Sequence, residues 1–359
     1  MIGLKSHVRL GLDIGSHAVK IVVTEKGSHG KMRLVKALSR EIYTGQEKYD
    51  PDGPKKTSVV PLILEMFQEA SLRPKRIAHL GSSIGGVHVA AKEIRTLQLS
   101  EDEMTSSILQ EARKHLPLDG TESVVDYQVM GEDPKEADKV RVLIAATTKR
   151  LFDGHVDILR ELELKPGVVD LEPLAAMNSY LGHVELPDDG VVVFLNIGAR
   201  RTNLVIIGRK DTFFTRDLPV GGYQFTEEIM KSLNVKYQEA EEIKKTQGLG
   251  TQGIQQVSDA THEIGSLAVA EKSVMDKLGD EINRSLRYYV KETGQSFFNR
   301  IELVGGTAES RELIAYLEKK FNIEVRPYDP FAHVEGSGEV RHRPQYATAV
   351  GLAQRAQAI

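Results

Sequence analysis

Two short segments of this sequence share a design that suits phosphate binding. Residues 10–23 read LGLDIGSHAVKIVV and residues 191–207 read VVVFLNIGARRTNLVII, so a short polar stretch with a glycine interrupts each apolar run. The glycine lets the backbone approach a ligand closely, and a neighbouring hydroxyl such as that of Ser16 donates to a phosphate oxygen. One such turn alone is more often an ordinary hairpin with a solvated aspartate. Two of them can hold a polyphosphate from opposite sides, so the repeat favours a phosphate site.

The two turns differ at one chemically important position, which is Asp13 in the first and Asn196 in the second. A carboxylate such as Asp13 holds Mg²⁺ through water, and Lys20 on the return strand can neutralise phosphate charge. The amide of Asn196 is neutral and carries donors, so it binds metal-bound water less well and cannot act as a base. The second turn also carries Arg200 and Arg201, which either contact phosphate or are solvated at the turn tip, and we favour solvation.

The composition is that of a globular protein with more than one core. The chain has 359 residues, of which 27% are charged, and a formal net charge of −4. These values predict two or more subdomains and no surface for nucleic acid. Cysteine is absent, which excludes disulfides and thiolate chemistry. No signal peptide and no apolar run of roughly 20 residues is present, so we expect a cytoplasmic protein that reaches a membrane only through partners.

Residues 77–165 predict a small α+β insertion between the first hairpin (8–24) and the second. Strand patterns lie near 87–94, 124–130 and 140–148, and helical patterns at 101–116 and 152–164. On the first of these helices one apolar face is predicted, formed by Ile108, Leu109, Ala112 and Leu116. Residues 45–58, rich in proline, glycine and charge, predict a surface loop.

The second half of the chain predicts helices that begin or end at glycines. Gly221 and Gly222 interrupt a strand and open a helix, residues 236–248 form another helix with a glycine cap, and 249–266 predict a loop. A long helix follows, whose core face comprises Leu278, Ile282, Leu286 and Tyr289. Residues 301–322 predict a strand, a Gly-Gly turn and a helix, which together aim backbone N–H groups at an anion.

The order of these motifs resembles the actin and Hsp70-type ATPases. DLEPLAAMNSY at 170–180 resembles their first connecting helix, and TAVGLA near Gly351 resembles the second. Ala-Glu-Glu-Ile-Lys at 240–244, followed by Gly248, resembles the helix that touches ribose and adenine, and Gly-Gly-Thr at 305–307 resembles the adenosine motif. Without this order Glu172 would be interpreted as a helix N-terminal charge favoured by the macrodipole, and Lys244 as solvated.

The resemblance implies an α/β chain with a two-lobed actin-like (ribonuclease H-like) ATPase fold and an inserted small α+β subdomain. The expected first lobe comprises 1–76 and 166–189 with the C-terminal helix 345–359, and the inserted partner-binding subdomain comprises 77–165. The expected second lobe core comprises 190–222 and 299–344, and a nucleotide-capping subdomain comprises 223–298.

The resemblance also implies ATP or ADP binding with Mg²⁺. Glu172, which orients the attacking water in that superfamily, and Asp13 are the expected catalytic residues, and Asp13 is also expected to hold Mg²⁺ through water. Because Asn196 stands where that pattern has an aspartate, we expect slow or absent hydrolysis. The expected nucleotide contacts are Gly15, Ser16, His17, Lys20, Asn196, Gly198, Thr202, Gly221, Gly222, Glu241, Lys244, Gly305, Gly306 and Thr307.

Within the superfamily nearly the whole chain resembles the PilM family of type IV pilus assembly. LQEARKHLPLDGTESVVDYQVM in the insertion and KKFNIEVRPYDPFAHV carry this resemblance. It implies capture of the N-terminal cytoplasmic peptide of PilN in a groove near residues 80–165, contacts with other pilus platform and motor components, and a location peripheral to the inner membrane through a partner.

Three alternatives stay open. A polymerising ATPase of the FtsA kind is one, although FtsA ends in a membrane-targeting amphipathic helix, for which AVGLAQRAQAI is too short and too small-sided. A type II secretion homologue of the same fold is another. A small-molecule kinase of this fold is the third, although no aspartate is evidently placed as a substrate base.

Overall fold

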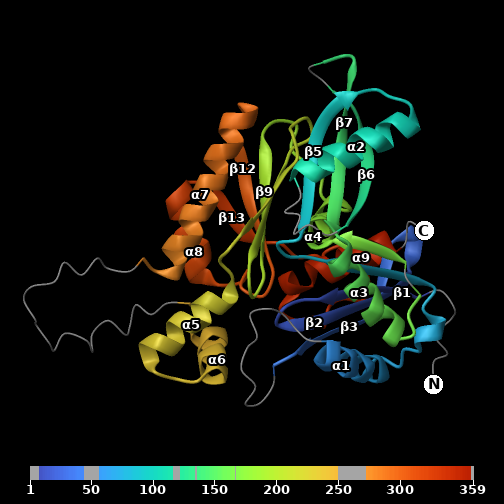
Figure 1. Cartoon of the computed structure of the whole chain (residues 1–359). Helices are drawn as coiled ribbons and strands as arrows, with labels where there is room; N and C mark the ends of the chain where they lie inside the picture. Colours follow the sequence, from blue (N-terminus) through green and yellow to red (C-terminus); the bar gives the residue numbers. More distant parts are fainter. Residues whose placement is uncertain are drawn as a thin grey trace, which may run out of the picture.

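Two five-stranded sheets form the centres of two lobes, and a three-stranded sheet forms a smaller body beside them (Figure 1). The computed structural model describes residues 8–43, 56–115, 122–133, 136–165, 167–249 and 272–356. Outside these ranges lie most of the loop expected over 45–58, Leu116, and the loop expected over 249–266 from residue 250 on.

The first sheet has the strand order β3-β2-β1-β4-β8. Its strands β1 (Arg9–Ile14), β2 (Ala18–Lys26) and β3 (Met32–Glu41) are antiparallel neighbours, and β4 (His79–Ile84) and β8 (Val168–Leu171) continue it in parallel. Alternate residues of β1 face opposite sides of the sheet. Leu10 and Leu12 belong to the core that the sheet forms with α1 (Lys56–Glu69) and α3 (Lys149–Glu161). Gly11 faces the other side, where it packs against α9 (Ala347–Arg355). The predicted hairpin over 8–24 is confirmed.

The second sheet repeats the first. Its order is β11-β10-β9-β12-β13. The strands β9 (Val191–Ile197), β10 (Thr202–Ile207) and β11 (Phe214–Leu218) are antiparallel neighbours, and β12 (Phe298–Val304) and β13 (Glu324–Pro327) continue the sheet in parallel. The similarity between the two hairpins in the sequence therefore extends to two whole sheets with the same order and directions.

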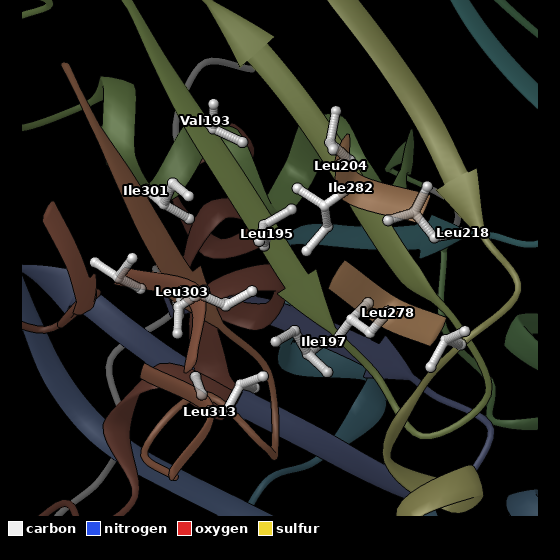
Figure 2. Close-up of a cluster of buried hydrophobic side chains, with 14 of the residues drawn as sticks. Val193, Leu195, Ile197, Leu204, Leu218, Leu278, Ile282, Ile301, Leu303 and Leu313 are labelled. Carbon is white, nitrogen blue, oxygen red and sulfur yellow. The ribbon is translucent and has the colours of Figure 1, made fainter. Parts of the chain in front are cut away.

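The core of the second lobe lies between its sheet and the helices α7 (Val274–Thr293) and α8 (Arg311–Phe321) (Figure 2). β9 is buried along its whole length, which is typical of a central strand covered on both faces. Leu195 and Ile197 belong with Leu278 and Ile282 to one buried cluster, and each such buried side chain stabilises the fold by about 1.5–3 kcal/mol. The predicted core face of the long helix is confirmed, since Leu278, Ile282, Leu286 and Tyr289 are all buried.

The inserted subdomain has a sheet and a core of its own. Its strands β5 (Val89–Leu97), β7 (Lys139–Thr148) and β6 (Ser123–Glu132) pair in that order, and α2 (Glu101–His115) packs on them. This body is narrower than the expected range 77–165. β4 pairs with β1, and Leu159, Leu162 and Leu164 at α3 belong to the core of the first lobe, so both flanks of that range are parts of the first lobe.

One expected core position on α2 is wrong. Leu109 is 41% exposed, whereas Ile108 and Ala112 are buried with Met104. The buried stripe therefore runs at four-residue steps through 104, 108 and 112, and position 109 lies about 100° around the helix from it.

Two pairs of helices complete the lobes. α5 (Gly222–Leu233) and α6 (Tyr237–Gln247) pack together beside the second lobe. α4 (Glu172–Leu181) and α9 cross between the lobes, and the 3-10 turns are Ser28–Gly30, Pro74–Arg76 and Arg343–Tyr346. A Cβ atom on Gly351 would lie 1.8 Å from the carbonyl oxygen of Ala175, so α4 and α9 meet backbone to backbone.

In the described part of the chain, no helix combines the length and the apolar character that a membrane span requires.

Candidate functional site

A cavity of about 730 Å³ lies between the two lobes, where the turns of both hairpins face each other. Gly15–His17 of the β1–β2 turn line one wall, and Gly198 of the β9–β10 turn lines the other. Gly305–Thr307, directly after β12, form a third part of the lining. Three turns around one cavity provide backbone groups that can surround a polyphosphate.

The first hairpin places a charged pair at the cavity. Asp13 and Lys20 are register partners on β1 and β2, and Lys20 Nζ donates to Asp13 Oδ2 at 3.1 Å. Asp13 is only 5% exposed, so the ammonium offsets the cost of burying this carboxylate. Both side chains line the cavity, where they face an incoming anion and its counter-ion.

The second hairpin places the amide of Asn196 between two oxygen acceptors. Its Nδ2 donates to Glu172 Oε1 and to Asn203 Oδ1, each at 3.3 Å. Asn203 Nδ2 in turn donates to Asp217 Oδ1 at 2.6 Å, which directs its own oxygen toward Asn196. The chain of contacts therefore requires a donor at position 196, which a carboxylate does not supply.

Glu172 begins α4 and combines an elevated pKa with a position at the cavity. The pKa of Glu172 is raised to about 7, first by burial and then by the nearby carboxylates of Asp13 and Asp217, whereas Lys20 and Asn196 act to lower it. A carboxyl group that ionises near neutral pH can accept a proton from water or orient it, which is the expected role of Glu172.

The acidic groups suit a hydrated magnesium ion. Among the residues that the structure describes, no cluster of three or more His, Asp or Glu side chains could hold a metal directly. Asp13 and Glu172 nevertheless line the cavity beside the phosphate-binding turns. Mg²⁺ usually keeps several waters and takes one or two carboxylates plus substrate phosphates, so this donor set fits it. Asp13 would hold it, and the ion would neutralise phosphate charge.

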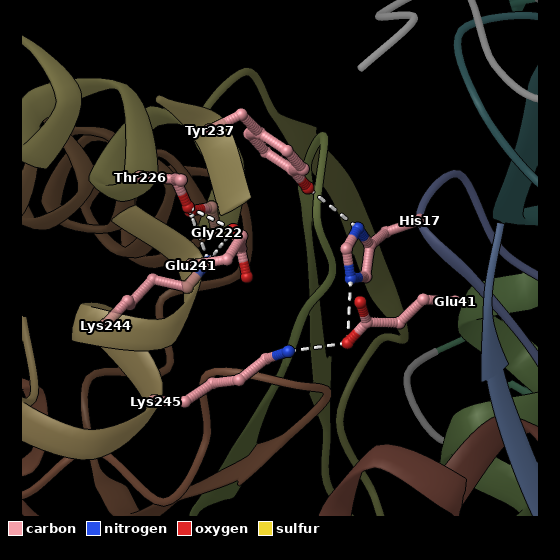
Figure 3. A network of polar contacts seen from close by, with 8 residues as sticks. All are labelled: His17, Glu41, Gly222, Thr226, Tyr237, Glu241, Lys244 and Lys245. Carbon is pink, nitrogen blue, oxygen red and sulfur yellow. Dashed lines mark hydrogen bonds and ion pairs between the residues drawn. The ribbon is translucent and has the colours of Figure 1, made fainter. Parts of the chain in front are cut away.

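Helices α5 and α6 supply a buried charged group at the other end of the cavity (Figure 3). Lys244 Nζ donates to Glu241 Oε1 at 2.5 Å, to Thr226 Oγ1 at 2.6 Å and to the Gly222 carbonyl at 3.1 Å. The Thr226 hydroxyl also donates to Glu241. Burial lowers the pKa of Lys244, and Glu241 opposes this shift. The two charged side chains are thereby held rigidly at the wall.

A second set of contacts joins the lobes across the cavity, and we call it the cross-cleft network (Figure 3). It consists of His17 and Glu41 of the first lobe and of Tyr237 and Lys245 of α6. The Tyr237 hydroxyl is 2.9 Å from His17 Nδ1, His17 Nε2 is 3.7 Å from Glu41 Oε1, and Lys245 Nζ donates to that oxygen at 2.6 Å. The contacts with His17 and then Lys245 lower the pKa of Glu41 to about 2 against the effect of burial. Glu41 is therefore charged at every physiological pH.

All but two of the residues expected to bind nucleotide line this cavity. The exceptions are Thr202, which is fully buried and donates to the Val220 carbonyl at 2.8 Å, and Gly221, which packs against the β9–β10 turn. Thr202 and Gly221 therefore support the β9–β10 turn without lining the cavity. Arg200 and Arg201 also differ from expectation, because they are half-buried and line the cavity instead of being solvated.

Three residues of the cross-cleft network were not anticipated from the sequence. Tyr237 and Lys245 lie four residues to either side of Glu241, so one helix face carries all three, and this spacing was a usable signal. Glu41 ends a strand far away in the chain, and no local pattern relates it to α6.

The duplicated sheets, the cavity between them and the glycine turns are the features of a two-lobed actin-like fold. A family model described as type IV pilus assembly protein PilM matches residues 11–357. The chain therefore belongs to the PilM family of type IV pilus assembly proteins.

Individual proteins agree with this assignment. A chain of the solved PilM–PilN type IV pilus biogenesis complex is similar with a TM-score of 0.80 and 25% identity, over 97% of this chain and 98% of that one. The cell division protein FtsA of Neisseria meningitidis is 24% identical over 377 residues, which cover 95% of this chain and 88% of FtsA. MreB5 of Spiroplasma citri bound to AMPPNP shares the fold alone, with a TM-score of 0.53, 13% identity and coverage of 99% and 97%.

Proposed function

We propose that this protein is an ATP-binding scaffold of the type IV pilus inner-membrane platform that captures the N-terminal cytoplasmic peptide of PilN. The observation that carries the proposal is the likeness to the PilM–PilN complex, which includes the inserted subdomain because it covers 97% of the chain. ATP, or ADP after turnover, occupies the interlobe cavity with Mg²⁺. The protein is cytoplasmic and reaches the membrane through PilN, beside other platform and motor components.

Slow or absent hydrolysis is part of the proposal. Asn196 donates to Glu172 and so occupies the place of a second carboxylate without its charge. Nucleotide binding depends on the turns and on Glu241 and Lys244, which are intact at the cavity wall. The protein therefore holds nucleotide mainly to set its own shape.

The peptide groove is proposed at the junction of the first lobe and the inserted subdomain. The interlobe cavity extends there, between Val87 and His88 on one side and Arg150, Leu151 and Gly154 of α3 on the other. Val87 is 49% exposed although it is apolar, which suits contact with an apolar peptide side chain.

The test is calorimetric titration of the full chain with a PilN N-terminal peptide, with and without Mg-ATP. We expect binding of the peptide, none of a scrambled peptide, and a loss of about tenfold or more in affinity for Val87→Asp, because the new carboxylate would be desolvated. Leu64→Asp is the matched control, since Leu64 is a similarly exposed apolar residue on α1. No peptide binding in either condition would refute the proposal.

The FtsA likeness supports a second candidate, a polymerising ATPase. Sedimentation with Mg-ATP distinguishes the two: filaments that pellet with nucleotide favour the FtsA-like function, and a non-sedimenting protein that binds the peptide favours the scaffold.

A further inference from the structure

The outer strand of the inserted sheet has an open edge. In the order β5-β7-β6, β6 pairs with β7 alone among the described strands. It lies on the side of the inserted body away from the second lobe (Figure 1). The opposite edge strand, β5, faces that lobe, since Glu93 of β5 accepts from the Phe213 N–H at 3.0 Å. An open edge presents a row of backbone donors and acceptors to which another extended chain can pair.

The hydrogen bonds of β6 show which of its residues direct their backbone groups outward. The Lys149 N–H donates to the Glu122 carbonyl at 2.7 Å, so the ladder with β7 uses the backbone of residue 122. Bonded and non-bonded positions alternate in an antiparallel ladder, so the odd-numbered residues within 123–129 direct their N–H and C=O groups away from β7. The Tyr127 N–H accordingly donates to the neighbouring Asp126 carboxylate at 2.8 Å, on the open side. A bulge follows position 129 and ends the regular stretch.

One face of this edge is apolar and only partly covered. Val125 and Tyr127 pack against the core beneath α2. Val129 follows on the same face and is 47% exposed. The Thr105 hydroxyl of α2 lies 3.2 Å from the Tyr127 hydroxyl. Leu109 lies one turn further along that side of the helix and is also exposed, so it borders the same edge.

The other face of the edge is acidic. Asp126 lies on it, Glu122 comes just before the strand, and Glu132 ends the strand. None of these three carboxylates forms an ion pair with a residue that the structure describes. Residues 122–133 contain neither lysine nor arginine. A second copy of β6 suits this edge poorly, because an antiparallel copy centred on Tyr127 would place Glu122 opposite Glu132.

We propose that the β6 edge over 123–129 binds an extended segment of a partner protein in which apolar residues alternate with lysine or arginine. The segment adds a fourth strand to the inserted sheet. Its apolar side chains cover Val129 and Leu109, and its basic side chains face Asp126, because side chains along a strand alternate between the two faces. The residues of β6 are not part of the interlobe cavity lining, so this inference goes beyond the proposed function.

The test titrates the full chain with a capped synthetic peptide of about seven residues that alternates valine and lysine. One control peptide alternates valine and glutamate, and the other has the valines and the lysines in two separate blocks. Calorimetry measures the affinity, and amide hydrogen exchange locates the peptide. We expect the alternating basic peptide to bind, to protect the Val125 and Val129 N–H groups, and to bind about fivefold or more tightly than either control.

Two variants separate backbone pairing from charge. Val129→Pro removes an N–H that the ladder with β7 does not use, which an edge strand tolerates, and the peptide affinity should fall about fivefold or more. Asp126→Lys places like charges opposite each other and should also weaken binding about fivefold. Glu65→Lys makes the same charge change at an exposed position on α1 and should keep the wild-type affinity.

Four results would overturn the proposal. The first is a wild type that does not bind the alternating basic peptide, and the second is binding that Val129→Pro and Asp126→Lys both leave unchanged. The third is equal affinity for the basic and the acidic peptide. The fourth is self-association in sedimentation equilibrium that Val129→Pro abolishes, because the occupant of the edge would then be a second copy of this chain.

Discussion

At the scale of single residues, Asn196 links Glu172 and Asn203, and a carboxylate at position 196 could not make these links. Its amide donates to Glu172 and Asn203, and Asn203 passes the chain on to Asp217. With Asp13 also close to Glu172, an aspartate at 196 would add a fourth acidic group to one buried cluster. The amide therefore stabilises this buried cluster.

Asn196→Asp should have opposite effects on stability and on turnover. Without nucleotide, the loss of two buried donations lowers the free energy of unfolding by about 1–3 kcal/mol, measured by urea denaturation. With Mg-ATP, the new carboxylate holds metal-bound water, and hydrolysis rises about 100-fold in a phosphate-release assay. Asn196→Ala is the control and should lose stability without gaining turnover. Equal turnover in Asn196→Asp and the wild type, with ATP bound, would show that another residue limits hydrolysis.

The ionisation of Glu172 predicts a pH dependence of the residual hydrolysis. Because its pKa is raised to about 7, the carboxylate is the minor form at pH 6 and the major form at pH 8. Hydrolysis that uses the carboxylate should rise about tenfold between these values and level off above them.

Glu172→Gln is the control and should abolish this rise. The same raised pKa means that the folded state retains a proton which the unfolded chain releases above pH 4.5, so Glu172 costs stability as pH rises from 4.5 to 7. Glu172→Gln should remove that cost. A pH profile centred near 4.5 would contradict the raised pKa.

At the scale of elements, α6 makes two sets of contacts. Glu241 and Lys244 form a buried group within the capping helices, whereas Tyr237 and Lys245 contact His17 and Glu41 across the cavity. The cross-cleft network spans the cavity between α6 and the first hairpin, so we expect it to slow the release of a nucleotide held there.

Tyr237→Phe with Lys245→Met should speed the release of a fluorescent ADP analogue roughly fivefold in stopped-flow displacement, because the variant lacks a hydrogen bond and a partly exposed ion pair. Lys231→Met is the control, since Lys231 pairs with Glu227 on α5. Equal release rates in the wild type and the variant would mean that the network does not retain nucleotide.

The elements that the sequence predicted correctly are those whose pattern is local. Both hairpins show apolar alternation around a glycine, and the turn after β12 shows its Gly-Gly pair. β4 was missed because its sequence, HLGSSI, contains small residues. The reason for Gly81 is tertiary: a Cβ atom there would lie 2.2 Å from the Leu352 carbonyl of α9. The contact of Glu41 with α6 likewise depends on distant packing.

At the scale of the whole molecule, turns from both lobes line one cavity, so a nucleotide bound there would contact both lobes. Mg-ATP at about 100 times its Kd should stabilise the fold by about 2.7 kcal/mol and raise the melting temperature by several degrees, measured by differential scanning calorimetry. AMP is the control, because it lacks the phosphates that reach both hairpin turns, and it should produce a smaller shift. Equal shifts for ATP and AMP would contradict a polyphosphate held from both sides.

The crossing of α4 and α9 has a consequence for how the protein can signal. Gly351 and Ala175 bring the two backbones into direct contact, with no side chain between them at this point. If the lobes rotate against each other, we expect this crossing to be the pivot, because displacement grows with distance from the axis of a rotation. A small rotation at the crossing would then become a larger displacement at the remote ends of both lobes.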